Sequence, residues 1–195
     1  MPAVVVPHAT AVGPGYLYRA VLGSAIPTMT AAANVFTDAW PAAWAPAGVT
    51  RDGSQFSYEV TSEGITVAEY LDVLDEVETS RSIGVAFDLA HITDKSYALA
   101  FNGISSSATG TGAATVTKLG PPVLGASVKT MLGWESQDST QRAIFYQCLQ
   151  SGNIQFSNQK APNFQSLPLT FKVSQPTSGD PFNIWLAGTN RLAAA

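Results

Sequence analysis

The chain has 195 residues, a length that favours one domain over two very small ones. Charged residues make up only 12%, about half of the ~25% usual in soluble domains. Together with 16 Gly and 12 Pro, this composition excludes a coiled coil and a helical bundle, and the net charge of −4 excludes a basic nucleic-acid-binding domain. A surface so poor in charge favours association, so we expect the protein to assemble.

The first third of the chain is predicted to hold an arm, a strand and a long irregular segment. Residues 1–15 are apolar but rich in Pro and Gly, which predicts an extended N-terminal arm. Strand-forming residues at 16–22 predict a strand. Residues 24–46 carry three prolines around Trp40 and Trp44 and predict a long irregular segment. Loops of that length inside a domain are usually functional.

The clearest periodicity lies in the middle of the chain. Apolar and polar residues alternate over 55–61, the pattern of a half-buried strand. Glu63-Gly64 is expected to break this strand, and its continuation over 65–73 predicts a hairpin. A second alternating run predicts a strand over 82–90.

The second half is predicted to be mostly strand. Thr93 and Asn102-Gly103 supply start and stop signals for one helix over 93–103, and the Ser/Gly/Thr tract at 104–112 predicts a flexible loop. Turn residues separate five further expected strands, at 113–119, 126–134, 142–149, 167–173 and 182–186.

These elements predict a mainly β fold, a β-sandwich or partly open barrel with one flanking α-helix. The expected organisation is an N-terminal arm (1–15), a single β domain (16–187) that contains the long 24–46 loop, and a C-terminal arm (188–195).

No motif for catalysis or cofactor binding is present. His8 and His91 have no further ligands at metal-binding spacing, and there is no G-x-S-x-G elbow, P-loop or dinucleotide fingerprint. The apolar sequence around Cys148 predicts a buried side chain rather than a nucleophile. The acidic run 75–78 predicts a solvated turn. We therefore expect no catalytic residues, no cofactor and no metal, and a protein that is not an enzyme.

The sequence also predicts no targeting signal. No basic residue precedes Arg19, and Pro7 ends the first apolar run early, so no signal peptide is expected. No run of eighteen apolar residues occurs, so no membrane span is expected. These features predict a protein made and kept in a cytoplasm.

Charge is distributed unevenly along the sequence. Residues 59–88 hold eight acids and one base, whereas residues 118–172 hold five bases and two acids. One interpretation is chance combined with solubility. The other is a head-to-tail interface in which unlike faces meet, together with an acidic surface to which DNA does not adhere.

The order of these segments resembles the major tail tube proteins of long-tailed bacteriophages with non-contractile tails. The resemblance runs from Tyr16 to Leu186. It is carried by the first strand (16–20), the Pro- and Trp-bearing segment up to Trp44, and the segment Ala47–Gly53 that opens an acidic strand pair. The strand at 85–90, the helix at 93–101 and the closing segments at 167–173 and 180–185 complete it.

The resemblance implies a structural virion protein, assembled in the host cytoplasm, that forms stacked hexameric rings. In such rings the subunits contribute strands to an inner β-barrel, and arms and loops reach between neighbours. The acidic lumen conducts genomic DNA without binding it specifically. A tape-measure protein, a terminator and a distal tail protein are the other partners implied, with no membrane. The basic surplus at 118–172 is the departure from an acidic lumen.

Two sets of residues are candidates under this resemblance. The strand pair at 57–72 is assigned to the lumen, with Glu59, Glu63 and Glu69 as the candidates. Aromatic residues in the 24–46 segment are assigned to subunit contacts, with ordinary core packing as the alternative; they are Phe36, Trp40 and Trp44.

Two other functions remain open. One is a related virion or secretion β-sandwich, namely a tail terminator, a capsid decoration protein or a secretion-tube subunit, which would self-associate but differ in ring size and in whether rings stack without limit. The other is a carbohydrate-binding β-sandwich with an aromatic stacking platform, which would be a stable monomer. The platform residues would be Tyr16, Tyr18, Trp134 and Trp185.

Overall fold

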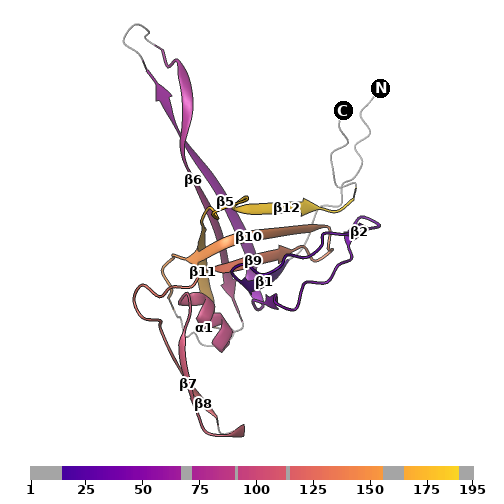
Figure 1. The fold of residues 1–195 in the computed structure, drawn as a ribbon, viewed down its shortest axis with the longest axis vertical. Coiled ribbons are helices and arrows are strands. Elements are labelled where there is room, and N and C mark those ends of the chain that lie inside the picture. Colours follow the sequence, from indigo (N-terminus) through magenta and orange to yellow (C-terminus); the bar gives the residue numbers. More distant parts are fainter. Residues whose placement is uncertain (1–14, 67–71, 91, 113–114, 156–164, 189–195) are drawn as a thin grey trace.

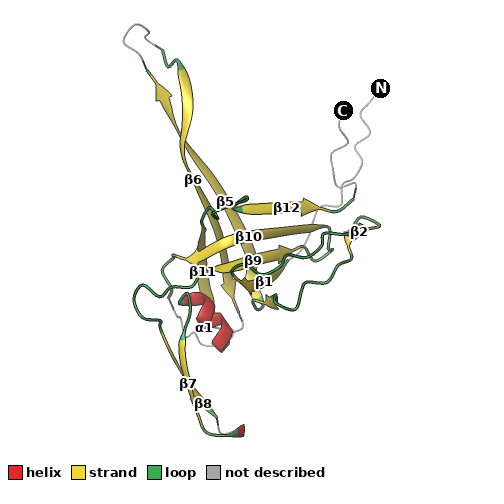
Figure 2. Ribbon diagram, viewed as in Figure 1, coloured by secondary structure: helices red, strands yellow, loops and turns green. Residues whose placement is uncertain are grey.

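The fold is mainly β, with one α-helix among the residues described (Figures 1 and 2). The computed structural model describes residues 15–66, 72–90, 92–112, 115–155 and 165–188. Their elements are β1 (Tyr16–Val21), β2 (Ala31–Ala32), β3 (Val35–Phe36), β4 (Ala45–Pro46), β5 (Thr50–Ile65), β6 (Asp75–Leu89), α1 (Asp94–Ala100), β7 (Ser105–Thr109), β8 (Val116–Gly120), β9 (Thr130–Glu135), β10 (Gln141–Gln150), β11 (Leu167–Val173) and β12 (Phe182–Leu186).

One bent antiparallel sheet forms the body. Its strand order is β4-β1-β9-β10-β11-β6-β5, and β12 pairs with β10. The first part of β10 pairs with β9 and β12, whereas Cys148–Gln150 at its end pair with β11. Strand β10 therefore carries the sheet from one layer, with β1, β9 and β12, into a second layer of β11, β6 and β5. Figure 1 shows β5 and β6 crossing the first layer at a steep angle.

The core lies between the two layers. Strand β11 shows why: its odd-numbered residues from Leu167 to Val173 are buried, and the residues between them are more exposed, so one face of the strand points inward. Phe171 stacks on Phe87 of β6, with ring centroids 5.6 Å apart. Leu132 of β9 is fully buried opposite them in the same cluster.

Helix α1 closes one end of this core. Thr93 caps it: its hydroxyl accepts from the Ser96 N–H, and the Ser96 hydroxyl accepts from the Thr93 N–H. Leu99 and Ala100 are buried in the core cluster. The predicted helix is confirmed, with a C-terminal end at Ala100.

The predicted mainly β class with one helix is confirmed, and the described strands do not close into a barrel. The expected strands at 167–173 and 182–186 have the observed bounds. The division into a single domain with two arms stays a prediction, because residues 1–14 and 189–195 lie outside the described part.

The predicted break at Glu63-Gly64 is wrong. Strand β5 continues through both residues to Ile65, because Glu63 pairs with Val77 and Gly64 with Glu76. The partner strand is therefore β6, not residues 65–73. It includes the acidic run 75–78, which is exposed as expected but lies in a strand rather than a turn.

The predicted flexible loop at 104–112 is also wrong in part. Residues Ser105–Thr109 form β7, which pairs with β8 in a second hairpin. The sequence predicts a loop because a tract of serine and threonine lacks the alternation of apolar and polar residues found in a half-buried strand. A strand can still form there, because the hydrogen bonds between two strands need no buried face. This hairpin is exposed on both strands over most of its length and extends away from the body (Figure 1).

A matched pair of leucines tests the position of the core. Leu132→Ala should lower the free energy of unfolding by about 2–5 kcal/mol, because Leu132 is 0% exposed and its removal leaves a cavity. Leu124→Ala should change it by less than about 0.5 kcal/mol, because Leu124 is fully exposed. Urea unfolding followed by tryptophan fluorescence measures both. Equal effects would contradict this placement of the core.

Candidate functional site

The most prominent feature is the end of the β5–β6 hairpin that projects beyond the body (Figure 1). We call its described residues, 59–65 and 72–82, the arm. Every one of them is exposed. At its root, Phe56 of β5 contacts Phe145 and Phe182, with ring centroids 5.4 and 5.0 Å away, and Ile83 of β6 is buried. The root therefore belongs to the core and the arm does not.

The arm is strongly acidic. It carries one base, Arg81, whose guanidinium donates to Gln175 rather than to a carboxylate. No ion pair to an arm acid is found among the described residues. The charge is therefore left to solvent or to a partner. The acids are Glu59, Glu63, Asp72, Asp75, Glu76 and Glu78.

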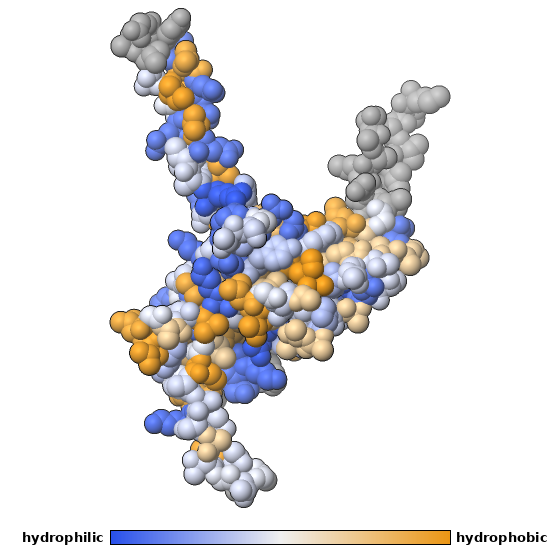
Figure 3. Space-filling view, viewed as in Figure 1, coloured by the Kyte–Doolittle hydropathy of each residue, from blue (hydrophilic) through white to orange (hydrophobic). Residues whose placement is uncertain are grey.

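Apolar side chains accompany the acids toward the outer end of the arm (Figure 3, orange among blue). Leu74 donates its N–H to the carbonyl of Ile65, and a Cβ at Gly64 would lie 2.8 Å from Val73, so these residues are close together. Four exposed apolar residues make up this arm end: Ile65, Val73, Leu74 and Val77.

Two of the predicted lumen residues lie on one face of the arm. Ser57 pairs with Gly84, and a Cβ at Gly84 would meet the Ser57 hydroxyl, so both face away from the core. Alternation along β5 places Glu59 and Glu63 on this same side. Glu69 lies outside the described residues. Whether this face lines a lumen stays a prediction.

The predicted contact aromatics pack within the chain. Phe36 and Trp44 are buried, and Trp40 is half-buried between Tyr18 and Trp44, at centroid distances of 4.3 and 4.9 Å. They place the 24–46 segment over the outer face of β1, β9 and β10. Tyr18 completes this outer cluster. Core packing accounts for their positions, and the assignment to subunit contacts stays a prediction.

A buried ion pair fixes this outer cluster. The Arg142 guanidinium lies 3.0 Å from the Glu135 carboxylate and donates at 2.6 Å to the carbonyl of Asp38. The Trp40 indole N–H donates to the second oxygen of Glu135. Arg142 also lies 4.9 Å from the centre of the Phe36 ring, a cation–π contact. The pair thus joins the sheet to the irregular segment.

Sequence reasoning missed this pair. In the sequence, Glu135 and Arg142 are seven residues apart, on either side of a predicted turn, and no pattern marks them as partners. They meet because Arg142 of β10 lies directly opposite Glu135 of β9 in the ladder. An opposite-charge pair flanking a short turn between two strands is the only signal that could have indicated it.

The proposed carbohydrate platform is not assembled. Tyr18 and Trp185 pack with the outer cluster, whereas Trp134 packs against the core between the layers. Tyr16 is exposed at the start of β1. Because Trp134 lies on the opposite face of the layer from Tyr18 and Trp185, the four rings do not form one stacking surface.

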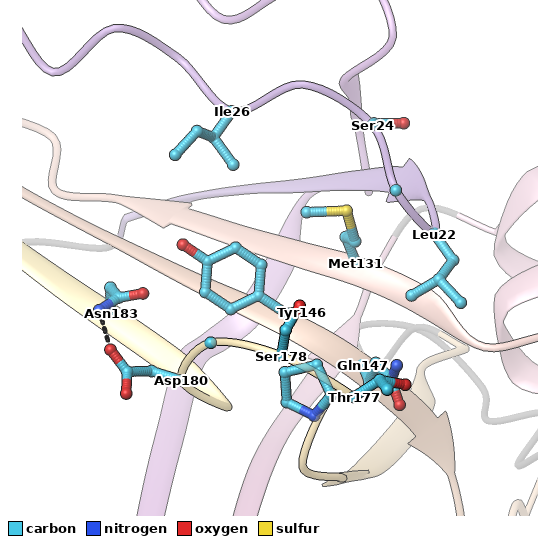
Figure 4. A pocket seen from close by; sticks show the side chains of 13 residues that line it. Leu22, Ser24, Ile26, Met131, Tyr146, Gln147, Thr177, Ser178, Asp180 and Asn183 are labelled. Atoms are coloured by element: carbon cyan, nitrogen blue, oxygen red, sulfur yellow. Dashed lines mark hydrogen bonds between the residues drawn. The ribbon is translucent and has the colours of Figure 1, made fainter.

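A pocket of about 490 Å³ lies beside the outer cluster, between the turn after β1 and the loop before β12 (Figure 4). Ile26 and Met131 form apolar walls, and the Asn183 amide donates to Asp180 at 3.1 Å. Burial, and then the charge of Asp180, raise the pKa of the Tyr146 phenol. The lining includes no His that could act as a general base and no Cys that could act as a nucleophile.

The structure bears in part on the predictions about metal ligands, the single cysteine and membrane spans. His8 and His91 lie outside the described residues, and no group of three or more potential metal ligands is found among those described. Cys148 is buried as predicted, and burial raises its thiol pKa to about 12, which suits a packing role. In the described part of the chain, no helix has the length and apolarity needed to cross a membrane.

The comparison with solved structures gives a distant likeness, and the other two comparisons give none. No family model matches the chain, and no curated protein matches it. A solved structure titled "Cryo-EM structure of the anti-feeding prophage (AFP) baseplate, 6-fold symmetrised" contains a chain that aligns over 90% of this chain and 95% of its own length. The TM-score is 0.40 and the identity 10%. At these values the likeness does not extend to function.

Removing one partner of the buried pair should be costly. Arg142→Ala leaves the Glu135 carboxylate buried without its cation, so the free energy of unfolding should fall by about 3–5 kcal/mol. The control is Arg51→Ala, which breaks the exposed ion pair with Asp52 and should cost at most about 1 kcal/mol. Urea unfolding compares the two, and a small loss for Arg142→Ala would show that the pair does not hold the cluster.

Proposed function

We propose that the chain is a self-assembling structural protein of a virion tail. In this proposal, copies form hexameric rings, the rings stack into a tube, and the acidic lumen conducts the genome during ejection. The observation that carries the proposal is the arm, an acidic and partly apolar hairpin whose described residues are all exposed and which is linked to the body by the Arg81 hydrogen bond to Gln175.

The physics of the arm supports self-association. An isolated two-stranded hairpin is marginally stable in water, so an arm of this length benefits from a surface to pack on. Its outer strand is β5, whose second edge is unpaired within the described residues. A free strand edge next to exposed apolar side chains favours pairing with another chain. The arm end provides both features.

Charge supports the tube over a DNA-binding role. Glu59 and Glu63 extend the outer face of the β5–β6 hairpin, which has small residues at Ser57 of β5 and Gly84 of β6. Six copies at −4 each would give a ring a charge of −24. A surface of this kind repels a polyanion and offers it no anchoring side chains, which suits passage without binding.

The proposal includes partners and location. Tape-measure, terminator and distal tail proteins would complete the tail, the DNA would pass through without specific contacts, and the protein would be a virion component without catalytic activity. A tail terminator or a capsid decoration protein is the rival. Either would form closed rings or small oligomers that do not stack without limit.

Two double substitutions test the role of the arm. Leu74→Ser with Val77→Ser removes apolar surface at the arm end, and the control Val123→Ser with Leu124→Ser removes the same residue types from an exposed loop after β8. Sedimentation velocity over a range of protein concentrations should show large assemblies for the wild type and the control, and a shift to the monomer for the arm variant. The shift is expected because only the arm residues would be buried between copies.

Two results would contradict the proposal. Wild-type protein that stays monomeric throughout would remove the basis for self-assembly. Assembly of the arm variant equal to that of the control would show that the arm end is not at an interface between copies. Circular dichroism of each variant verifies that the fold is retained.

A further inference from the structure

The sandwich is open on the side where β1 begins. A cleft of about 180 Å³ enters the core there, between the layers. Phe56 of β5 and Ile184 of β12 stand at its mouth and are 41% and 51% exposed, although both have apolar neighbours. The rim is polar but uncharged. Apolar walls come from Leu17, Phe56, Val85, Trp134, Ala143, Phe145 and Ile184, and the polar rim from Ser54, Gln55 and Gln141.

The cleft borders an unpaired strand edge. Residues 54–58 of β5 pair with β6 on one side, and no described strand pairs with the other side. Main-chain N–H and C=O groups on this edge can bind one more extended segment. Because side chains of such a segment alternate, every second one would face the cleft.

A segment of the chain itself ends at this place. Residues 1–14 lie outside the described part and join it at Gly15. A Cβ at Gly15 would lie 2.0 Å from the indole nitrogen of Trp134, so the backbone runs directly against a wall of the cleft. Fourteen residues span up to about 46 Å when extended, which is ample to pass along β5.

The sequence of this segment fits the cleft. The sequence of residues 3–6 is apolar, with three β-branched valines after Ala3, and Pro2 and Pro7 limit it at both ends because proline cannot donate to a ladder. In an extended segment, Val4 and Val6 point to the same side. Two valines at this spacing match an uncharged apolar cleft, which would disfavour a charged occupant.

We propose that residues 3–6 of the chain's own N-terminus add as a strand to the free edge of β5 at residues 54–58 and place Val4 and Val6 over the cleft. This inference does not rest on the proposed tube, because the docking is within one chain and uses the body rather than the arm. It differs from the expectation, implied by the resemblance, that the N-terminal residues 1–15 reach a neighbouring copy.

Crosslinking between engineered cysteines tests the docking in the full chain. Val6→Cys with Ile184→Cys places two accessible thiols at the cleft, and a short bismaleimide joins them when they are close. The native Cys148 is fully buried and does not compete. Val6→Cys with Val116→Cys is the control, because Val116 is exposed on the β7–β8 hairpin.

Mass spectrometry separates the crosslink within one chain from the crosslink between two chains. A tethered segment has an effective concentration of about 1 mM, so at about 10 μM protein the product within one chain should exceed the product between chains by about a hundredfold. It should form with Cys at position 184 and far less with Cys at position 116. Predominant crosslinks between chains would assign the segment to a neighbour and overturn the inference. Equal yields at positions 184 and 116 would show that the segment does not dock.

Discussion

The arm projects from the body in a fixed direction because aromatic side chains pack together at its root. Phe56 of β5 lies against Phe145 and Phe182 of the opposite layer, and Tyr58 also contacts the Phe182 ring. Beyond this point the described part of the hairpin has its own ladder and the hydrogen bond from Arg81 to Gln175, whereas an isolated two-stranded hairpin is only marginally stable in water. The body therefore anchors the hairpin at one end and leaves an acidic, partly apolar surface at the other. That division between anchored root and unpartnered arm is the basis for the proposed assembly.

The opposite face of the first layer is covered by the segment 24–46, which is mostly irregular and contains the short sheet of β2 and β3. The buried pair of Glu135 and Arg142 holds this segment through the Trp40 indole and the Asp38 carbonyl. The Thr30 N–H donates to the carboxylate of Asp38, which holds the pKa of this carboxyl below its ordinary value and fixes the segment locally. A long loop with embedded aromatics thus serves as a packing layer.

Much of the fold could be predicted from the sequence, because alternation and turn residues report directly on strands that bury one face. The strand at 167–173 and the Thr93 cap are examples. The arm and β7 could not, because neither buries a face, and only cross-strand pairing keeps Gly64 or Ser105 extended. For the candidate site, the acidic bias of residues 59–88 was visible in the sequence. The outer cluster was not, since its aromatics and its ion pair meet only through the register of β9 and β10.

Negative-stain electron microscopy of the purified chain, over a range of concentrations and salt, tests whether copies of the chain assemble into a tube. We expect hollow filaments or stacked rings, with six-fold symmetry in end views, once the concentration is high enough for the β5–β6 arm of each copy to meet a neighbouring copy. Closed rings that never stack would contradict a tube and favour a terminator or decoration protein. Single particles at every concentration would contradict self-assembly itself.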